Sequence, residues 1–397
     1  MVIIKGVVKL LVLLVSVALL AIALTGFSPI YNFRSATPFS GNDIFNPYST
    51  FDPALGWSRA NFHTHTRVDG ILNECDYTPL QTLEFYNQLG YDIVTFSNHN
   101  RLTEHPTEPS LQVELYEHGY NIFKFHKLVF GAERVMRFDH LLPLTASQKQ
   151  FQIDMLTAQS DIVTINHPLR TKSLSHDQLE KIDSYQLIEL DSGKSSENSY
   201  WDAALSAGRY SFGIANDDLH HPNRTNAIAI RSNLLNTYSA NYSDLLQSLR
   251  SGCFYSMRTP DYGDGDWSAK ILKNRDLPFV RNIGLHDNSA PYIALSQRAD
   301  SIKVFGQHHT TLATAYHCDS ICYTMAASDP YCRFTAYFSD GEVIYSNPFA
   351  RYDSTVAESP FTAEHSVNTI LTILFNALLL AVSAAIVVVT YKIVIKW

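Results

Sequence analysis

Residues 59–70 read RANFHTHTRVDG, and this stretch is the most informative part of the sequence. Its middle, over residues 60–65, is a short run typical of a buried strand, and it ends in two histidines one residue apart. Alternate residues of a strand point to the same side, so His63 and His65 are placed to bind one metal ion together. Taken alone an H-x-H pair is a weak signal. Its meaning depends on what the other strands carry at the same position.

Further short β-rich runs follow, separated by helical stretches with recognisable ends. Thr78-Pro79-Leu80-Gln81 is a capping box with proline in the first turn, and Gly252 is placed to end a helix over residues 244–251. Seven strands separated by helices predict a parallel α/β sheet or barrel. The expected strands are 60–65, 91–97, 127–133, 161–167, 185–191, 210–216 and 226–231.

Past Gly263 the pattern changes to short or alternating apolar runs, with Asp340-Gly341 as a hairpin signal. This favours a small β-rich domain after the α/β part. The runs there are 302–305, 320–325, 334–338 and 342–345.

Candidate ligands recur where the expected strands end. In an α/β barrel the loops after the strands converge on one face, and that face carries the site. Ligands from five separate strand ends therefore predict one metal site, although each motif alone is weak. The candidates are Asp69, His99, Glu133, His140, His167, Asp218 and His220, in addition to the H-x-H pair.

These motifs resemble, in order, those of the PHP (polymerase and histidinol phosphatase) family: FHTHTRVDG, TFSNHN, GAE followed by His140, INHP and NDDLH. The resemblance covers about residues 60–256, and the later stretch is similar to a subgroup with a small β-domain after the barrel. It implies a distorted seven-stranded (β/α) barrel and a metal-dependent phosphoesterase. The implied reaction is hydrolysis by a metal-bridging hydroxide, with two or three divalent ions such as Mn²⁺, Zn²⁺ or Fe²⁺.

The resemblance also implies roles for individual residues. His63 and His65 would bind the first ion, Asp69 and His99 another, and Glu133 would bridge two ions. His140 and His167 would complete the coordination, and Asp218 and His220 would close the site; Glu133, Asp218 and His220 are the expected catalytic residues. One departure stands out, because the family usually has Asp where this chain has Asn98.

The substrate-side residues are less constrained by the sequence. Arg170 follows the fourth strand and Lys194 the fifth, so each is either a phosphate-binding residue or a solvated loop charge. Glu189 lies on the fifth strand and is a candidate to support the metal ligands.

Two other functions remain open from the sequence. One is an amidohydrolase-like or PHP-like enzyme that cleaves a carboxyl ester or a C–N bond; that superfamily uses a lysine from the fourth strand, which Asn166-His167 does not offer. The other is a catalytically weak, membrane-anchored binding domain, for which Asn98 is the sequence hint.

Both ends of the chain are strongly apolar. Lys5 and Lys9 precede an apolar run that reads either as a cleaved signal peptide or as an uncleaved anchor, and the uncharged stretch 370–390 is long enough to span a bilayer. Basic residues flank both segments on their terminal sides, which predicts that the intervening part lies outside the cytoplasm. The net charge of −8 without a basic run argues against nucleic-acid binding. The expected partners are the membrane and a small-molecule or lipid-linked phosphoester.

Together these patterns predict six segments. They are a signal peptide or N-terminal anchor (1–27), a linker (28–58), the barrel (59–262), the β-rich domain (263–350), a second linker (351–368) and a transmembrane helix (369–391).

Overall fold

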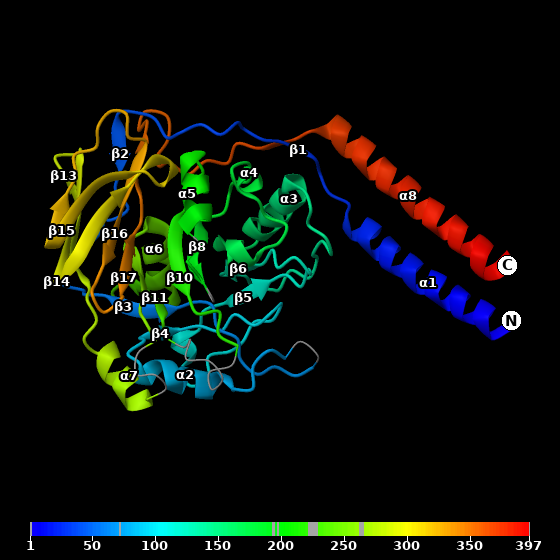
Figure 1. Cartoon of the computed structure of the whole chain (residues 1–397), viewed down its shortest axis with the longest axis horizontal. Helices are drawn as coiled ribbons and strands as arrows, with labels where there is room; N and C mark the ends of the chain where they lie inside the picture. The colour runs from blue at the N-terminus through cyan, green and yellow to red at the C-terminus, as the bar shows by residue number, and fades with distance from the viewer. Residues whose placement is uncertain are drawn as a thin grey trace.

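The chain folds into a mixed α/β body from which two long terminal helices extend (Figure 1). The computed structural model describes residues 2–396 except 71–72, 193–194, 197, 221–228 and 262–265. The first half of the strand expected at 226–231 therefore falls outside the described residues, and β11 begins at Arg231.

One six-stranded sheet forms the centre of the body, in the order β10-β8-β7-β6-β5, with β9 paired to β8. Strands β10, β8 and β7 are parallel to one another, but β6 is antiparallel to both β7 and β5. The start of β6 therefore lies at the same edge as the ends of β5 and β7. The bounds are β5 Leu115–His118, β6 Lys127–Phe130, β7 Ile162–Ile165, β8 Leu187–Ser192, β9 Ser195–Ser196 and β10 Phe212–Asn216.

A second sheet of 11 strands contains the first two strands of the expected α/β part together with the C-terminal β-rich region. Its order is β13-β14-β16-β17-β12-β11-β3-β4, with β15 on β14, β18 on β16 and β2 on β18; only β3 and β4 pair in parallel. The expected β-rich domain is thus continuous with β12 through β17. The bounds are β2 Asp43–Phe45, β3 Ser58–Asn61, β4 Ile93–Val94, β11 Arg231–Leu235, β12 Phe254–Arg258, β13 Val280–His286, β14 Ala290–Phe305, β15 Thr311–Cys322, β16 Tyr331–Tyr337, β17 Val343–Ser346 and β18 Phe349–Tyr352.

Two isolated parallel bridges join the sheets at the edge where the candidate ligands lie. Thr64, after β3, bridges Leu219, after β10, and His99, after β4, bridges Glu117 on β5. The residues that follow β3 and β4 are thereby held beside the ends of β10 and β5.

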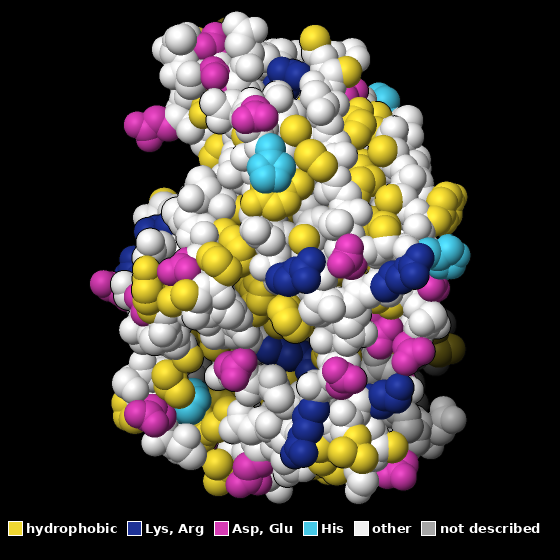
Figure 2. Space-filling model, turned by 90° about the vertical axis from the view of Figure 1, so that its left-hand side faces the viewer, with side chains coloured by type: hydrophobic (Ala, Val, Ile, Leu, Met, Phe, Trp, Pro, Cys, Tyr) yellow, Lys and Arg dark blue, Asp and Glu magenta, His cyan; other side chains and the backbone are white. Residues whose placement is uncertain are grey.

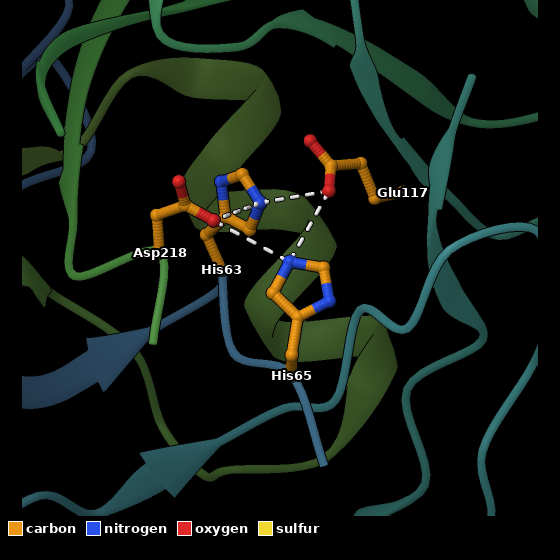
Figure 3. A group of neighbouring side chains, drawn as sticks. All are labelled: His63, His65, Glu117 and Asp218. Carbon is orange, nitrogen blue, oxygen red and sulfur yellow. Dashed lines mark ion pairs between the residues drawn. The ribbon is translucent and has the colours of Figure 1, made fainter. Parts of the chain in front are cut away.

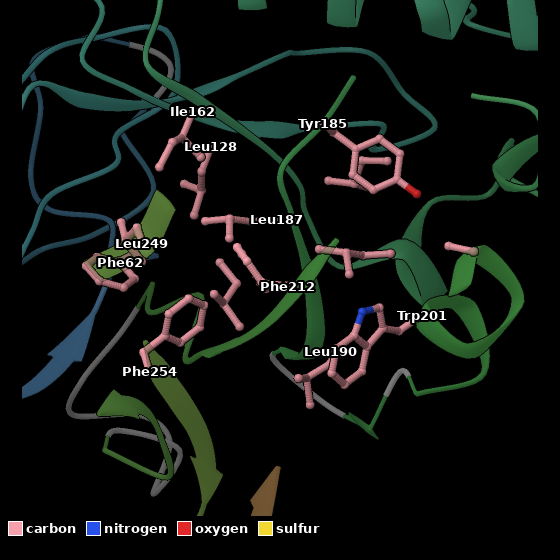
Figure 4. Packing of buried hydrophobic residues seen from close by; sticks show 14 of the residues in the cluster. Phe62, Leu128, Ile162, Tyr185, Leu187, Leu190, Trp201, Phe212, Leu249 and Phe254 are labelled. Atoms are coloured by element: carbon pink, nitrogen blue, oxygen red, sulfur yellow. The ribbon is translucent and has the colours of Figure 1, made fainter. Parts of the chain in front are cut away.

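Apolar side chains fill the space behind this edge (Figure 4). Phe62 is fully buried there, with its ring 5.5 Å from that of Phe130. Burial of such a side chain contributes roughly 1.5–3 kcal/mol. Because Phe62 directly precedes His63, this packing fixes the strand that carries the H-x-H pair.

The helix signals in the sequence are confirmed. Thr78 accepts a hydrogen bond from the Gln81 amide in a complete capping box, and α2 starts at Pro79. Gly252 ends α6 with a φ of 82°, and an added Cβ there would meet the ring of Phe212. The helices of the body are α2 Pro79–Gln88, α3 Ala146–Thr157, α4 His176–Leu179, α5 Asn198–Ser206, α6 Tyr242–Ser251 and α7 Trp267–Asn274.

The terminal helices α1 (Val2–Thr25) and α8 (Thr369–Lys396) pack against each other. The hydroxyl of Thr390, near the outer end of α8, donates to Ser16 Oγ in the middle of α1 over 2.6 Å, and the Ile30 amide donates to Thr372 Oγ1 over 2.9 Å near the body. The two helices are therefore antiparallel, and both chain termini lie at the far end (Figure 1). Each is long and apolar enough to cross a membrane.

A short stalk connects these helices to the body. Strand β1 (Tyr31–Asn32) pairs with β19 (Ser366–Val367). Beside it His365 donates from Nδ1 to Asp183 over 2.6 Å and from Nε2 to Asp154 over 3.1 Å. The hydrogen bonds to Asp154 and Asp183 raise the pKa of His365 to about 9, so the ring is charged at neutral pH.

We expect His365→Ala to detach the stalk, because two carboxylates lose their shared cation. A pKa raised from 6.5 to about 9 stabilises docking fully below pH 6.5, and the contribution is lost as the pH rises through 9. Limited proteolysis of the full chain within residues 353–368 should therefore be faster in the variant at pH 7. It should also accelerate in the unsubstituted chain above pH 9. The exposed His286→Ala is the control; equal cleavage rates in both variants would contradict this role.

Candidate metal centre

Four buried side chains converge where the two sheets meet: His63, His65, Glu117 and Asp218 (Figure 3). Nε2 of His63 lies 3.2 Å from Glu117 Oε2 and 3.1 Å from Asp218 Oδ1. Nε2 of His65 lies 3.2 and 3.4 Å from the same two oxygens. Ligand atoms bound about 2.1 Å from one ion lie roughly 3.0–3.4 Å apart in octahedral or tetrahedral geometry. The spacing of these four atoms therefore fits a shared metal ion.

The unpaired nitrogen atoms of the site support this fit. Nε2 of His63 and Nε2 of His65 are buried without a hydrogen-bond partner, although carboxylate oxygens lie close by. Buried polar atoms are normally hydrogen-bonded, so atoms that converge without bonding call for a further partner. Two imidazoles and two carboxylates suit Mn²⁺, Zn²⁺ or Fe²⁺.

Glu117 extends the group in two directions. Its Oε2 also lies 3.1 Å from His99 Nε2, while its Oε1 lies 3.2 Å from both His126 Nδ1 and His167 Nε2. Nε2 of His99 in turn lies 3.2 Å from Oε2 of Glu74, which extends the site toward solvent. Three overlapping ligand groups result, and Glu117 belongs to two of them. A carboxylate that faces separate groups with its two oxygens is arranged to bridge two ions.

The reversed direction of β6 explains why Glu117 and His126 meet. Glu117 lies near the end of β5, and His126 directly precedes β6, which runs back antiparallel to it. The end of β5 and the start of β6 therefore share the edge at which His167 follows β7.

Glu189 on β8 holds the ligands from behind. It accepts hydrogen bonds from His63 Nδ1 over 2.8 Å and from the His167 amide over 2.8 Å. Because Nδ1 of His63 donates to this carboxylate, Nε2 is left with its lone pair toward the centre. His167 and Asp218 have φ angles of 27° and 50°, conformations that non-glycine residues rarely adopt and that concentrate at functional sites.

The pKa directions describe a site ready for cations. Burial opposes the charge on Glu117, but His63, His99 and His126 outweigh it and hold the pKa of Glu117 well below its usual value. Burial lowers the pKa of His126 to about 4. For His65, burial is outweighed by the nearby carboxylates of Asp218 and Glu117, which raise the pKa to about 9. Ionised carboxylates and a neutral His126 are the forms that bind metals, and an ion at His65 would displace a proton.

The structure brings together five of the residues expected from the sequence and places a sixth at the opening of the site. This sixth residue is His220, whose Nδ1 donates to the Asp218 backbone oxygen over 2.8 Å and whose Nε2 lies 3.9 Å from Glu74. Asp218, and not its neighbour Asp217, faces the centre, since Asp217 accepts hydrogen bonds from Tyr86 and the Arg231 amide. The five are His63, His65, His99, His167 and Asp218.

Glu133 and His140 lie elsewhere, which corrects the expectation that they are ligands. β6 runs opposite to its neighbours, so its end lies at the edge of the sheet away from the metal centre. Glu133 follows that end, and its side chain is exposed. His140 instead contacts the backbone oxygen of Thr25 at the end of α1. Glu117 and His126 occupy the positions expected of this pair.

Asp69 is likewise corrected. It is exposed, and Glu74 from the same loop approaches His65 and His99 in its place. Lys194 lies outside the described residues. Arg170 lies at the opening of the site, where its guanidinium forms an ion pair with Asp218 Oδ2. Burial works against the charge of Arg170, but Asp218 outweighs it and raises its pKa.

Three residues of the site were not predicted: Glu74, Glu117 and His126. Residues 113–118 read VELYEH and alternate weakly, so β5 is hard to recognise from sequence. His126 precedes a strand, whereas ligands were expected only after strands. Asn98 accepts from the Thr66 amide and donates to Thr66 and Thr103, so it fastens two loops beside His99.

Comparison with solved structures finds two chains that match. The chain is similar to a PHP-like protein. One matching crystal structure is that of a two-domain protein from Bacteroides vulgatus that contains a predicted PHP-like metal-dependent phosphoesterase. Its sequence is 12% identical to this chain, and the TM-score between the two structures is 0.38. The match covers 80% of this chain and 100% of that one. No family model and no curated protein matches the chain.

The metal centre can be tested by exchanging one atom in Glu117. We expect Glu117→Gln to weaken metal binding at least about 10-fold, because even the supporting partners of ligands contribute about 10–100-fold in affinity. Glu133→Gln, on the exposed side, should bind as the unsubstituted chain does. Titration of the chelator-stripped full chain with Mn²⁺ measures both. Loss of affinity in Glu133→Gln but not in Glu117→Gln would reverse the assignment.

Proposed function

We propose that the chain is a metal-dependent phosphoesterase whose site is built around Glu117. The observation that carries this is the set of three overlapping His/carboxylate groups in one buried centre. Divalent ions held by such ligands supply an activated water and positive charge for the phosphate oxygens. His63, His65 and Asp218 would hold one ion, His99 and Glu74 another, and His126 and His167 a third, with Glu117 shared.

Two residues at the opening of the site are suited to act on the substrate. Arg170 is 27% exposed and retains guanidinium N–H groups beyond the one that contacts Asp218, so it can bind a phosphate oxygen. His220 is 32% exposed, and its Nδ1 is held by the Asp218 backbone, which leaves Nε2 toward the opening. Burial lowers the pKa of His220, so the ring is neutral at neutral pH with its proton on Nδ1, and Nε2 can act as a general base at the opening. Asp218 orients both residues.

We further interpret β3, β4, β5, β6, β7, β8 and β10 as a distorted seven-stranded barrel. The two bridges at Thr64 and His99, which link the ends of the sheets, support this. The barrel would span residues 59–262, with the β-rich domain over 263–350.

We also propose that α1 and α8 cross the membrane as a hairpin. Their polar side chains pair with each other rather than with lipid, as Thr390 does with Ser16 and Asn376 does with the backbone of Ser28. Lys5 and Lys9 near one end and Lys392 and Lys396 near the other favour a cytoplasmic side for both termini and an extracytoplasmic body. The substrate is then a small or lipid-linked phosphoester outside the cytoplasm.

An activity assay on the detergent-solubilised full chain tests the reaction. We expect the metal-loaded protein to hydrolyse an aryl phosphomonoester or phosphodiester, and chelator to abolish this. Arg170→Ala should lower kcat/KM about 10–100-fold, since a hydrogen bond to a charged group contributes about 1.5–3 kcal/mol.

Arg281→Ala, an exposed arginine on β13, is the matched control and should leave kcat/KM unchanged. Metal content must be equal in the two variants for the comparison to report on substrate binding. Chelator-sensitive cleavage of an aryl carboxyl ester alone would replace the phosphoesterase by an esterase. Bound metal without any turnover would favour a binding domain.

A further inference from the structure

Four large apolar side chains are exposed on loops between the metal centre and the base of α1. Their exposed fractions are 48% for Tyr120, 69% for Ile122, 54% for Leu144 and 48% for Leu169. We call these four residues the apolar rim. Single exposed apolar residues are ordinary, but several on adjoining loops mark an interaction surface.

The rim is attached to the mouth of the site. Tyr120 and Ile122 lie on the loop that connects Glu117 to His126, and Leu169 lies between His167 and Arg170. These two loops are bonded together, because the Lys172 amide donates to the Phe123 oxygen over 2.9 Å and Thr171 Oγ1 donates to the Lys124 oxygen over 2.7 Å. Three of the apolar rim residues are therefore only a few positions along the chain from the proposed ligands. A membrane that contacts them lies next to the mouth of the site.

The rim is also attached to the base of α1. The Leu141 amide donates to Thr25 Oγ1 over 3.3 Å, and Gln148 Nε2 donates to the Gly26 oxygen over 3.3 Å, close to Leu144. The same loop reaches Tyr120, whose amide donates to Asp139 Oδ2 over 2.8 Å. In Figure 1 the loops around β5 lie on the side of the body that faces α1. The rim is thus continuous with the point where the proposed membrane helix begins.

The loops that carry the apolar rim also carry exposed cations, at Lys124, Arg137 and Lys172. Apolar side chains among basic ones match the layered chemistry of a bilayer surface, with acyl chains beneath anionic headgroups. The face over β13–β15 differs, because there acidic and basic side chains are interspersed (Figure 2).

We propose that the apolar rim inserts into the outer surface of the bilayer and opens the metal centre toward phosphoesters carried by lipids. This rests on the proposed membrane crossing by α1 and α8. The stalk and the contacts of Thr25 and Gly26 hold the body close to the two helices. The apolar rim then provides a second contact between the body and the membrane, beside the metal centre. A lipid headgroup then reaches Arg170 without leaving the membrane.

Fluorescence quenching of the full chain in phospholipid vesicles tests this without requiring activity. Ile122→Trp and Leu169→Trp each add a tryptophan to the rim, and Tyr316→Trp, at a side chain 71% exposed on β15, is the matched control. Interfacial side chains lie roughly 5–10 Å into the headgroup and acyl boundary, so lipids brominated in the upper acyl chain should quench the added rim emission at least about two-fold. The emission added at residue 316 should be unaffected.

The outcomes separate this inference from the proposals beneath it. Quenching at both rim positions and not at the control supports the rim. Protein that floats with the vesicles but shows no rim quenching, or equal quenching at all three positions, overturns it and leaves the anchor intact. Protein that does not float with the vesicles overturns the membrane crossing and the rim together. None of these outcomes bears on phosphate release, which the activity assay measures.

Discussion

The structure depends on one buried carboxylate. Glu117 is almost inaccessible to water, and the rings of His63, His65, His99, His126 and His167 surround it. A buried carboxylate is strongly unfavourable unless cations or hydrogen bonds compensate it. Asn166 donates one such bond over 2.9 Å, and the remaining compensation comes from the imidazoles or from the ions that they and Glu117 would share.

The surrounding scaffold maintains this arrangement at some local cost. Phe62 packs into the apolar core while its neighbour His63 faces the centre, so one strand serves both stability and binding. Glu189 fixes the tautomer of His63 and bonds to the backbone of His167, whose unusual φ angle it helps to maintain. Strain of about 1–3 kcal/mol at such a residue persists only where neighbours determine its position, as they do here.

The sequence predicted what depends on local pattern. The capping box at Thr78, the helix end at Gly252 and the H-x-H pair all follow from short-range rules. The sequence could not exclude Glu133 as a ligand, because its position depends on the direction of β6. Only the pairing of β6 with β5 and β7 determines that direction. Glu117 was missed for a different reason: β5 is short, carries two charged or polar residues and has weak alternation. The sequence also did not reveal that the linker 28–58 is packed, with Tyr48 buried against the backbone of Phe254.

X-ray absorption spectroscopy of the full chain loaded with Zn²⁺ shows whether the histidines around Glu117 bind a metal ion. We predict nitrogen and oxygen neighbours at about 2.0–2.2 Å, with the multiple scattering of imidazole rings and of carboxylates, and loss of this signal in His63→Ala. A shell of oxygen atoms without imidazole scattering, or one unchanged in His63→Ala, would show that the histidines around Glu117 do not hold a metal ion.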